Sequence, residues 1–241
     1  MSGAPLRVAV LGASGRMGTA VRAVAGADPD IDIVSAWSRS QAASAGWTTD
    51  LAQALERADI AIDFSLPAAT PAIAAACIAH NTALVSGVTG LTDEAATALQ
   101  NAAVKVAVLH EHNLSLGVHV LSALVAQAAT WLPAEFDCSI VETHHTQKRD
   151  APSGTAVSIA AAVTEAAPDR EPAIVSVRGG NVVGDHQVAF MGPRERIELT
   201  HRADDRAVFA HGAIAAAKWL VTRSPGRLWR VADWLSATRG H

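Results

Sequence analysis

A glycine-rich turn near the N-terminus constrains this chain more than any other feature of its sequence. The apolar run at residues 6–11 is typical of a buried strand, and residues 19–25 favour a helix. Between them the glycines follow the spacing G-x-x-G-x-x-G. A strand, turn and helix in this order present helix N-terminal N–H groups to a phosphate. We therefore predict a dinucleotide site, rather than a purely structural turn, formed by Gly12, Ala13, Ser14, Gly15, Arg16 and Met17, with Gly18 allowing close helix packing.

The end of the second predicted strand, residues 31–37, indicates which nucleotide is bound. An acidic residue there would hold the adenosine ribose and repel a 2′-phosphate, but this chain has Ser38-Arg39-Ser40. A cation and two hydroxyls favour a 2′-phosphate. We predict NADPH as the preferred cofactor, with Arg39 as the 2′-phosphate contact. NADH, and a merely solvated Arg39, remain the alternatives.

Strands and helices alternate over the first half of the chain. Strands are predicted at 60–64, 83–86 and 105–109, separated by helices at 70–80 and from 92. This alternation predicts a Rossmann-like, doubly wound parallel sheet. The carboxyl ends of such strands line one crevice. The nicotinamide side is therefore expected to be formed by Gly87, Val88, Thr89, Glu111, His112, Asn113 and Leu114.

The pattern changes after Asn113. A long helix at 117–131, a half-buried strand at 136–145 and a helix at 155–166 precede strand-like sequence over 173–209. This order predicts an α+β domain with a mainly antiparallel sheet. The tail is helical again. We predict a dinucleotide-binding domain of residues 1–114 plus 212–241 and a second domain of residues 115–211.

The segment 142–155 holds the densest chemistry of the chain. Strand alternation places Glu142 and His144 on one face and His145 on the other, and Lys148 follows in a loop. Ser153-Gly154-Thr155 then begins a helix whose N–H groups can bind a carboxylate. Together these groups predict a cationic pocket for a dianion, with an exposed polar turn as the alternative. Zinc is disfavoured because adjacent histidines on opposite strand faces ligate one ion poorly and a third soft ligand is absent nearby, so we predict no metal.

Composition and charge exclude several classes of function. The formal net charge is −4 and the sequence has no basic block, which disfavours nucleic acid and anionic membranes as partners. No apolar run is long enough to span a membrane. The two cysteines, Cys77 and Cys138, give neither a disulfide framework nor metal spacing, which suits a reduced, cytoplasmic compartment.

At residues 142–156 the pattern E-x-H-H-x-x-K-x-D-A-P-S-G-T-A resembles the signature of the 4-hydroxy-tetrahydrodipicolinate (dihydrodipicolinate) reductase family. The glycine turn resembles that family's nucleotide loop. Further motifs, at residues 113–118, 183–190 and 209–213, resemble the family's hinge and its later motifs. The similarity extends along nearly the whole chain in the right order.

The resemblance implies an enzyme that uses NAD(P)H to reduce 4-hydroxy-tetrahydrodipicolinate to tetrahydrodipicolinate with loss of water, in the diaminopimelate route to lysine. His144 matches the proton donor and acceptor, and Lys148 the residue that stabilises developing charge. Substrate carboxylates are expected on His145, Lys148, Gly154 and Thr155. The family also implies a cytoplasmic homotetramer whose second domain binds substrate and forms the subunit contacts.

Two other classes of function remain open at this point. Another NAD(P)-dependent dehydrogenase of a small substrate would keep the glycine turn but has no reason to hold the histidine–lysine segment. A non-catalytic NADP(H)-sensing module would bind nucleotide yet tolerate loss of His144 and Lys148. The segment 142–156 therefore favours the reductase over both.

Overall fold

The chain divides into two compact units. A computed structural model describes residues 4–40 and 46–238. One unit comprises Met1–Leu114 and Phe209–His241, and the other comprises Ser115–Val208. Residues 1–3, 41–45 and 239–241 of the domain predicted from the sequence lie outside the described residues.

The first unit is built on a seven-stranded sheet in the order β11-β6-β5-β4-β1-β2-β3. Every neighbouring pair is parallel, which confirms the predicted doubly wound sheet. The strands are β1 (Leu6–Leu11), β2 (Ile31–Trp37), β3 (Trp47–Thr48), β4 (Ile60–Asp63), β5 (Ala83–Ser86), β6 (Val108–His110) and β11 (Leu228–Trp229).

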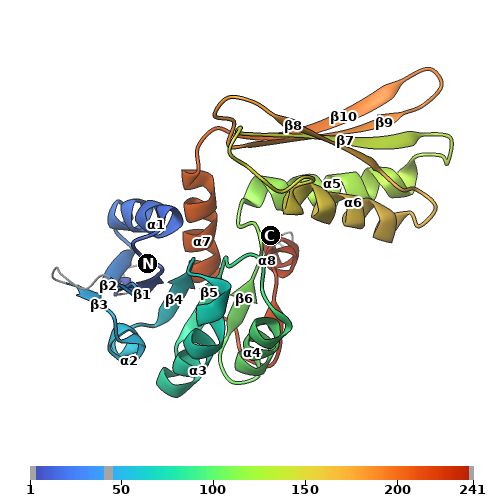
Figure 1. Cartoon of the computed structure of the whole chain (residues 1–241). Helices are drawn as coiled ribbons and strands as arrows, with labels where there is room; N and C mark the ends of the chain where they lie inside the picture. Colours follow the sequence, from blue (N-terminus) through green and yellow to red (C-terminus); the bar gives the residue numbers. More distant parts are fainter. Residues whose placement is uncertain (1–3, 41–45, 239–241) are drawn as a thin grey trace. The chain divides into compact units, whose positions relative to one another are not determined.

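Helices cover both faces of this sheet (Figure 1). On one face lie α1 (Arg16–Gly26), α7 (Ala207–Leu220) and α8 (Val231–Thr238), and on the other α2 (Leu51–Leu55), α3 (Thr70–His80) and α4 (Asp93–Ala103). A 3₁₀ turn, η1 (Pro67–Ala69), precedes α3. Strand β1 is apolar because both of its faces are buried. Val8 and Val10 belong to the core on one side of the sheet, and Ala9 and Leu11 belong to the core on the other side.

The second unit is a four-stranded sheet in the order β10-β9-β7-β8. Its strands are β7 (Asp137–His144), β8 (Ala173–Arg178), β9 (Gly184–Met191) and β10 (Arg196–Ala203). The mainly antiparallel sheet is confirmed, except that β7 and β8 are parallel. The parallel pair arises because α6 (Gly154–Ala166) connects the two strands as a crossover. Strand-like sequence was predicted up to residue 209, but β10 ends at Ala203 and α7 begins at Ala207.

Among the elements of the second unit, all of which are described, the helices cover one face of the sheet. Helices α5 (Leu116–Trp131) and α6 lie along it (Figure 1), and their core includes Ile140, Ile159 and Phe190. On the opposite face the alternation of β8 and β9 leaves Val175, Val177 and Met191 exposed. Within the described residues, no helix combines the length and apolar character needed to cross a membrane.

Candidate active site

The glycine turn of the first unit forms a tight cradle against the end of β4. Gly12 has φ +73°, and a Cβ added to it would lie 2.7 Å from the carbonyl oxygen of Phe64. A Cβ on Gly18 would lie 2.2 Å from the carbonyl oxygen of Gly12. Both positions therefore require glycine. The cradle opens onto the first turn of α1, whose N–H groups have no acceptor within the helix, so the turn fits a pyrophosphate.

A pocket beside this cradle reaches the end of β2. Ser38 is buried, and its hydroxyl lies 2.8 Å from that of Ser14, which ties the glycine turn to β2. Arg39 and Ser40 are exposed. None of the lining residues, all within the described part of the chain, is acidic. They are Gly12, Ser14, Gly15, Trp37, Ser38, Arg39, Ser40, Phe64, Ser65, Leu66 and Ala69.

The other predicted turn residues contribute mainly backbone. Ala13 is fully buried, and its N–H donates to the carbonyl oxygen of Trp37 over 3.0 Å. Met17 packs against the core that α1 shares with the sheet, while Arg16 is exposed at the start of the helix. Only Arg16 and Ser14 among the non-glycine residues of the turn therefore present exposed side chains.

Two residues of the loop after β5 are held by hydrogen bonds within the first unit. Val88 is only 2% exposed, and its carbonyl oxygen accepts a hydrogen bond from Nε2 of His110 over 2.9 Å. The N–H of Gly87 donates to the carbonyl oxygen of Asp63 over 2.9 Å. Thr89 is exposed. Of the three predicted residues in this loop, Thr89 is the one whose side chain is presented to solvent.

Glu111 has a different role from the one its polarity suggests. It is 7% exposed, and its carboxylate accepts hydrogen bonds from Arg230 Nε over 2.9 Å, from Arg230 Nη2 over 3.3 Å and from the N–H of Val231 over 3.3 Å. This arrangement fastens the end of β6 to the start of α8. Leu114 is also buried, whereas His112 is exposed. Glu111 and Leu114 can therefore contact a ligand only through their backbone.

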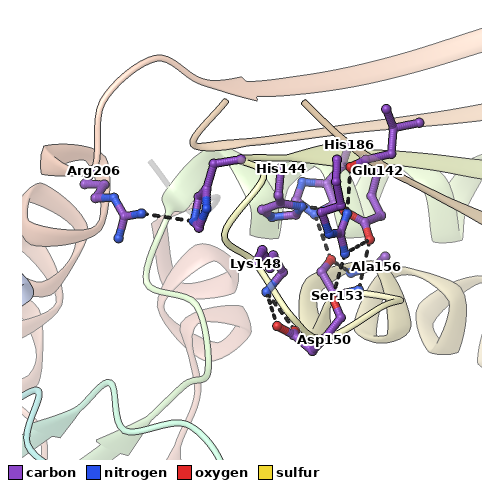
Figure 2. A network of polar contacts seen from close by, with 11 residues as sticks. Glu142, His144, Lys148, Asp150, Ser153, Ala156, His186 and Arg206 are labelled. Carbon is purple, nitrogen blue, oxygen red and sulfur yellow. Dashed lines mark hydrogen bonds and ion pairs between the residues drawn. The ribbon is translucent and has the colours of Figure 1, made fainter. Parts of the chain in front are cut away.

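The histidine–lysine segment of the second unit forms one polar network (Figure 2). As alternation predicts, Glu142 and His144 share one face of β7, and in the structure that face is buried. The Glu142 carboxylate accepts hydrogen bonds from His144 Nδ1, from Arg178 Nη1 and Nη2 over 2.9 and 2.8 Å, and from the Ser153 N–H over 3.2 Å. Burial raises the pKa of Glu142, but hydrogen bonds led by that of Arg178 outweigh it and hold this pKa at about 2. Glu142 is thus a buried, ionised carboxylate.

Two buried histidines lie side by side in this network. The rings of His144 and His186 are 5.3 Å apart, edge to face, and His186 Nε2 lies 3.3 Å from Ser153 Oγ. Burial lowers the pKa of His144 against the opposing pull of Glu142. Burial, together with the charge of His144, lowers the pKa of His186 to about 4. Both histidines are therefore biased toward the neutral form, and at His144 the Glu142 carboxylate opposes this bias.

Cationic groups surround the histidines. Lys148 Nζ lies 2.9 and 2.7 Å from the two carboxylate oxygens of Asp150, and Arg206 Nη2 lies 3.2 Å from Nε2 of His145. Helix α6 begins at Gly154, and the Ser153 hydroxyl caps it by accepting from the Ala156 N–H over 3.1 Å. Thr155 lies in the first turn, half-buried. The structure therefore gathers the sequence-predicted residues of this segment at one end of β7 and one end of α6.

Sequence reasoning missed three residues of these sites. Arg178 and His186 belong to the neighbouring strands β8 and β9, and Arg206 follows β10. The strand alternation of β9 places His186 on the buried face, and this signal was present in the sequence. The pairing that brings Arg178 to Glu142 had no local signal. Both cysteines are buried free thiols, and burial raises the pKa of Cys77 to about 12 and that of Cys138 to about 11.

The parallel sheet with its glycine cradle, together with the acid–base network, defines a Rossmann-like, nicotinamide-dependent oxidoreductase. The chain belongs to the dihydrodipicolinate reductase family. The family's N-terminal profile matches residues 6–114 and its C-terminal profile matches residues 117–235.

Related proteins match this chain over almost its full length. The 4-hydroxy-tetrahydrodipicolinate reductase of Stenotrophomonas maltophilia (strain R551-3) is 44% identical, over 98% of this chain and 100% of that protein. The protein of the same name from Xanthomonas campestris pv. campestris (strain B100) is also 44% identical, over 97% and 99%. A dipicolinate-bound dihydrodipicolinate reductase from Paenisporosarcina sp. TG-14 shares the fold, with a TM-score of 0.80 at 22% identity over 94% of this chain and 97% of that one.

Proposed function

We propose that this chain catalyses the NAD(P)H-dependent reduction of 4-hydroxy-tetrahydrodipicolinate to tetrahydrodipicolinate with loss of water, in the diaminopimelate route to lysine. The observation that carries the proposal is the network of His144, Glu142, Arg178 and Lys148, which offers a proton donor among cations. The curated relatives bear the name of this activity, and the related structure holds dipicolinate, a planar dicarboxylate.

The first unit provides the nucleotide site of this proposal. NAD(P)H, when bound, supplies the hydride. The pyrophosphate would lie on the backbone of the turn formed by Gly12, Ala13, Ser14, Gly15, Arg16 and Met17. Arg39 would bind a 2′-phosphate beside the Ser14–Ser38 hydroxyl pair, so NADPH is the preferred cofactor. Gly87, Thr89, His112 and Asn113 would approach the nicotinamide, and Val88, Glu111 and Leu114 would contribute backbone.

The second unit provides the dianion site. Lys148, Arg206 and the N-terminus of α6 at Gly154 and Thr155 supply positive charge for two carboxylates. His145, beside Arg206, would contact one carboxylate. His144 would give a proton to the ring as the hydride arrives, so that hydride, proton and released water balance. Lys148 would stabilise the charge that develops at the reacting end.

The exposed face of the second sheet supports a homo-oligomer. Val175, Val177 and Met191 expose apolar surface on the face opposite α5 and α6, where a second copy of the chain can cover it. We propose that this face forms the subunit contacts of a tetramer, as the family resemblance implies. The proposed biosynthetic role places the enzyme in the cytoplasm.

Steady-state kinetics test the proposed reaction. Substrate would be made in situ from pyruvate and aspartate semialdehyde, with NADPH and NADH assayed in parallel. We expect substrate-dependent oxidation by the wild type, a kcat lower by about 10²–10⁴-fold in His144→Gln because a positioned acid is lost, and no change in the control His80→Gln. His80 is exposed at the end of α3. Nucleotide binding without oxidation of either cofactor would favour another dehydrogenase or a sensing module.

A further inference from the structure

The buried Glu142–Arg178 pair explains how His144 is held for its chemistry. We propose that Glu142 and Arg178 are positioning residues. Glu142 fixes the proton of neutral His144 on Nδ1 and leaves Nε2 for the substrate. Arg178 holds Glu142 and the loop that carries Lys148 in fixed positions. This inference rests on the proposed function, in which His144 is the proton donor.

The Glu142 carboxylate is fully buried and accepts several hydrogen bonds. They come from two N–H groups of Arg178, the N–H of Ser153, the Ser176 side chain and Nδ1 of His144. An ionised carboxylate only accepts hydrogen bonds, so Nδ1 of His144 must be the donor. In the neutral ring Nε2 is then the unprotonated nitrogen, and in the imidazolium it carries the transferable proton.

The space around Nε2 of His144 is left open by a neighbouring glycine. A Cβ on Gly184 would lie 3.0 Å from Nε2 of His144, so the glycine keeps this edge of the ring clear. His186 does not compete for the carboxylate, because it is neutral and its own Nε2 is hydrogen-bonded with Ser153. Glu142 is the one negative group shown acting on His144, while Lys148 and Arg178 oppose protonation. Removing the Glu142 charge would therefore lower the pKa of His144 further.

A series of hydrogen bonds connects His144 to Lys148. Arg178 Nη2 donates to the carbonyl oxygen of Asp150 over 2.6 Å, and the Asp150 carboxylate binds Lys148 Nζ. Arg178 thereby joins β8 to the loop between β7 and α6. A continuous series of contacts runs from His144 through Glu142, Arg178 and Asp150 to Lys148. The pair therefore sets where the acid and the lysine lie relative to each other.

The tautomer of His144 in the wild-type protein gives a test that is independent of activity. Side-chain ¹⁵N correlation spectra of the full, ligand-free chain would be recorded above the pKa of His144, and its signals assigned by their loss in His144→Gln. We expect the Nδ1–H tautomer, whereas free histidine prefers Nε2–H. An Nε2–H tautomer at His144 would overturn the proposal, whatever reaction the enzyme catalyses.

Variants test the kinetic consequence. We expect Glu142→Gln to lower kcat by about 10–100-fold, as misplacement of a reacting group does, with KM for substrate changed by less than about threefold. The alkaline limb of the kcat profile, where His144 loses the proton that it donates, and the ¹⁵N titration of His144 should both move to lower pH. Arg178→Lys should show a smaller loss of kcat, and Glu165→Gln, exposed near the end of α6, none.

Unchanged kcat and an unchanged His144 titration in Glu142→Gln would refute the positioning role, as would a loss confined to KM. Circular dichroism of each variant establishes that it is folded. If Glu142→Gln does not fold, the wild-type tautomer and the response of Arg178→Lys decide the question.

Discussion

Replacing Arg39 with alanine should change which nicotinamide cofactor the enzyme prefers. Arg39 is exposed at the rim of the pocket, beside the Ser14–Ser38 hydroxyl pair, and the lining residues include no acid. A hydrogen bond to a charged group contributes about 1.5–3 kcal/mol, and each 1.4 kcal/mol is tenfold in affinity. The variant should therefore raise KM for NADPH by roughly 10–150-fold. KM for NADH and both kcat values should change by less than about threefold, because the 2′-phosphate is absent from NADH.

The assay is steady-state kinetics with both cofactors at fixed ionic strength, since exposed charges are screened by salt. Arg57→Ala is the matched control, because Arg57 is an exposed arginine of the same unit that does not line the pocket. Equal rises in KM for the two cofactors, or no rise for either, would refute the assignment of Arg39 to the 2′-phosphate.

Three further predictions concern the first unit. Gly18→Ala should weaken nucleotide binding at least tenfold in calorimetry, because the added Cβ would lie 2.2 Å from the carbonyl oxygen of Gly12. The control Gly26→Ala, on the same helix, should bind nucleotide normally, because its Cβ would meet nothing within 4 Å. Arg230→Ala should lower the melting temperature by several degrees, because the buried Glu111 carboxylate loses its charged partner, at a cost of about 1–2 kcal/mol. An unchanged melting curve would show that the Glu111–Arg230 ion pair does not stabilise the fold. Burial raises the pKa of Asp63 from 3.8 to about 6, so the native state keeps this proton longer than the unfolded chain. The free energy of unfolding should fall as pH rises from about 4 to about 6, by up to about 3 kcal/mol, and denaturant titrations of Asp63→Asn should lack that slope.

The fold of the first unit follows from local patterns in the sequence. The uniformly apolar run of β1 predicts a strand buried on both faces, and the glycines behind it predict a tight turn against a helix. Both features depend on residues that are neighbours in the chain. The alternation of β7 likewise predicted that Glu142 and His144 share one face, because the side-chain period of a strand is two.

The partners of the site residues depend on tertiary pairing and could not be predicted in the same way. Arg178 reaches Glu142 only because β7 and β8 are parallel neighbours, and this pairing follows from the path of α6 rather than from either strand. Arg230 is separated from Glu111 by 119 positions in the sequence. The Glu111 carboxylate follows a strand whose end is expected to face the nicotinamide, and a guanidinium from the far end of the chain holds it. Local polarity could not predict this contact.

Transfer of a labelled hydride tests the central claim most directly. NADPH deuterated at C4 of the nicotinamide, as each of the two stereoisomers, would be incubated with the enzyme and with substrate made in situ, and the product analysed by mass spectrometry. The account predicts that one of the two isomers yields tetrahydrodipicolinate heavier by one mass unit. The rate of deuterium transfer to this product should fall in His144→Gln. Oxidation of NADPH without deuterium in the product, or no oxidation at all, would contradict it.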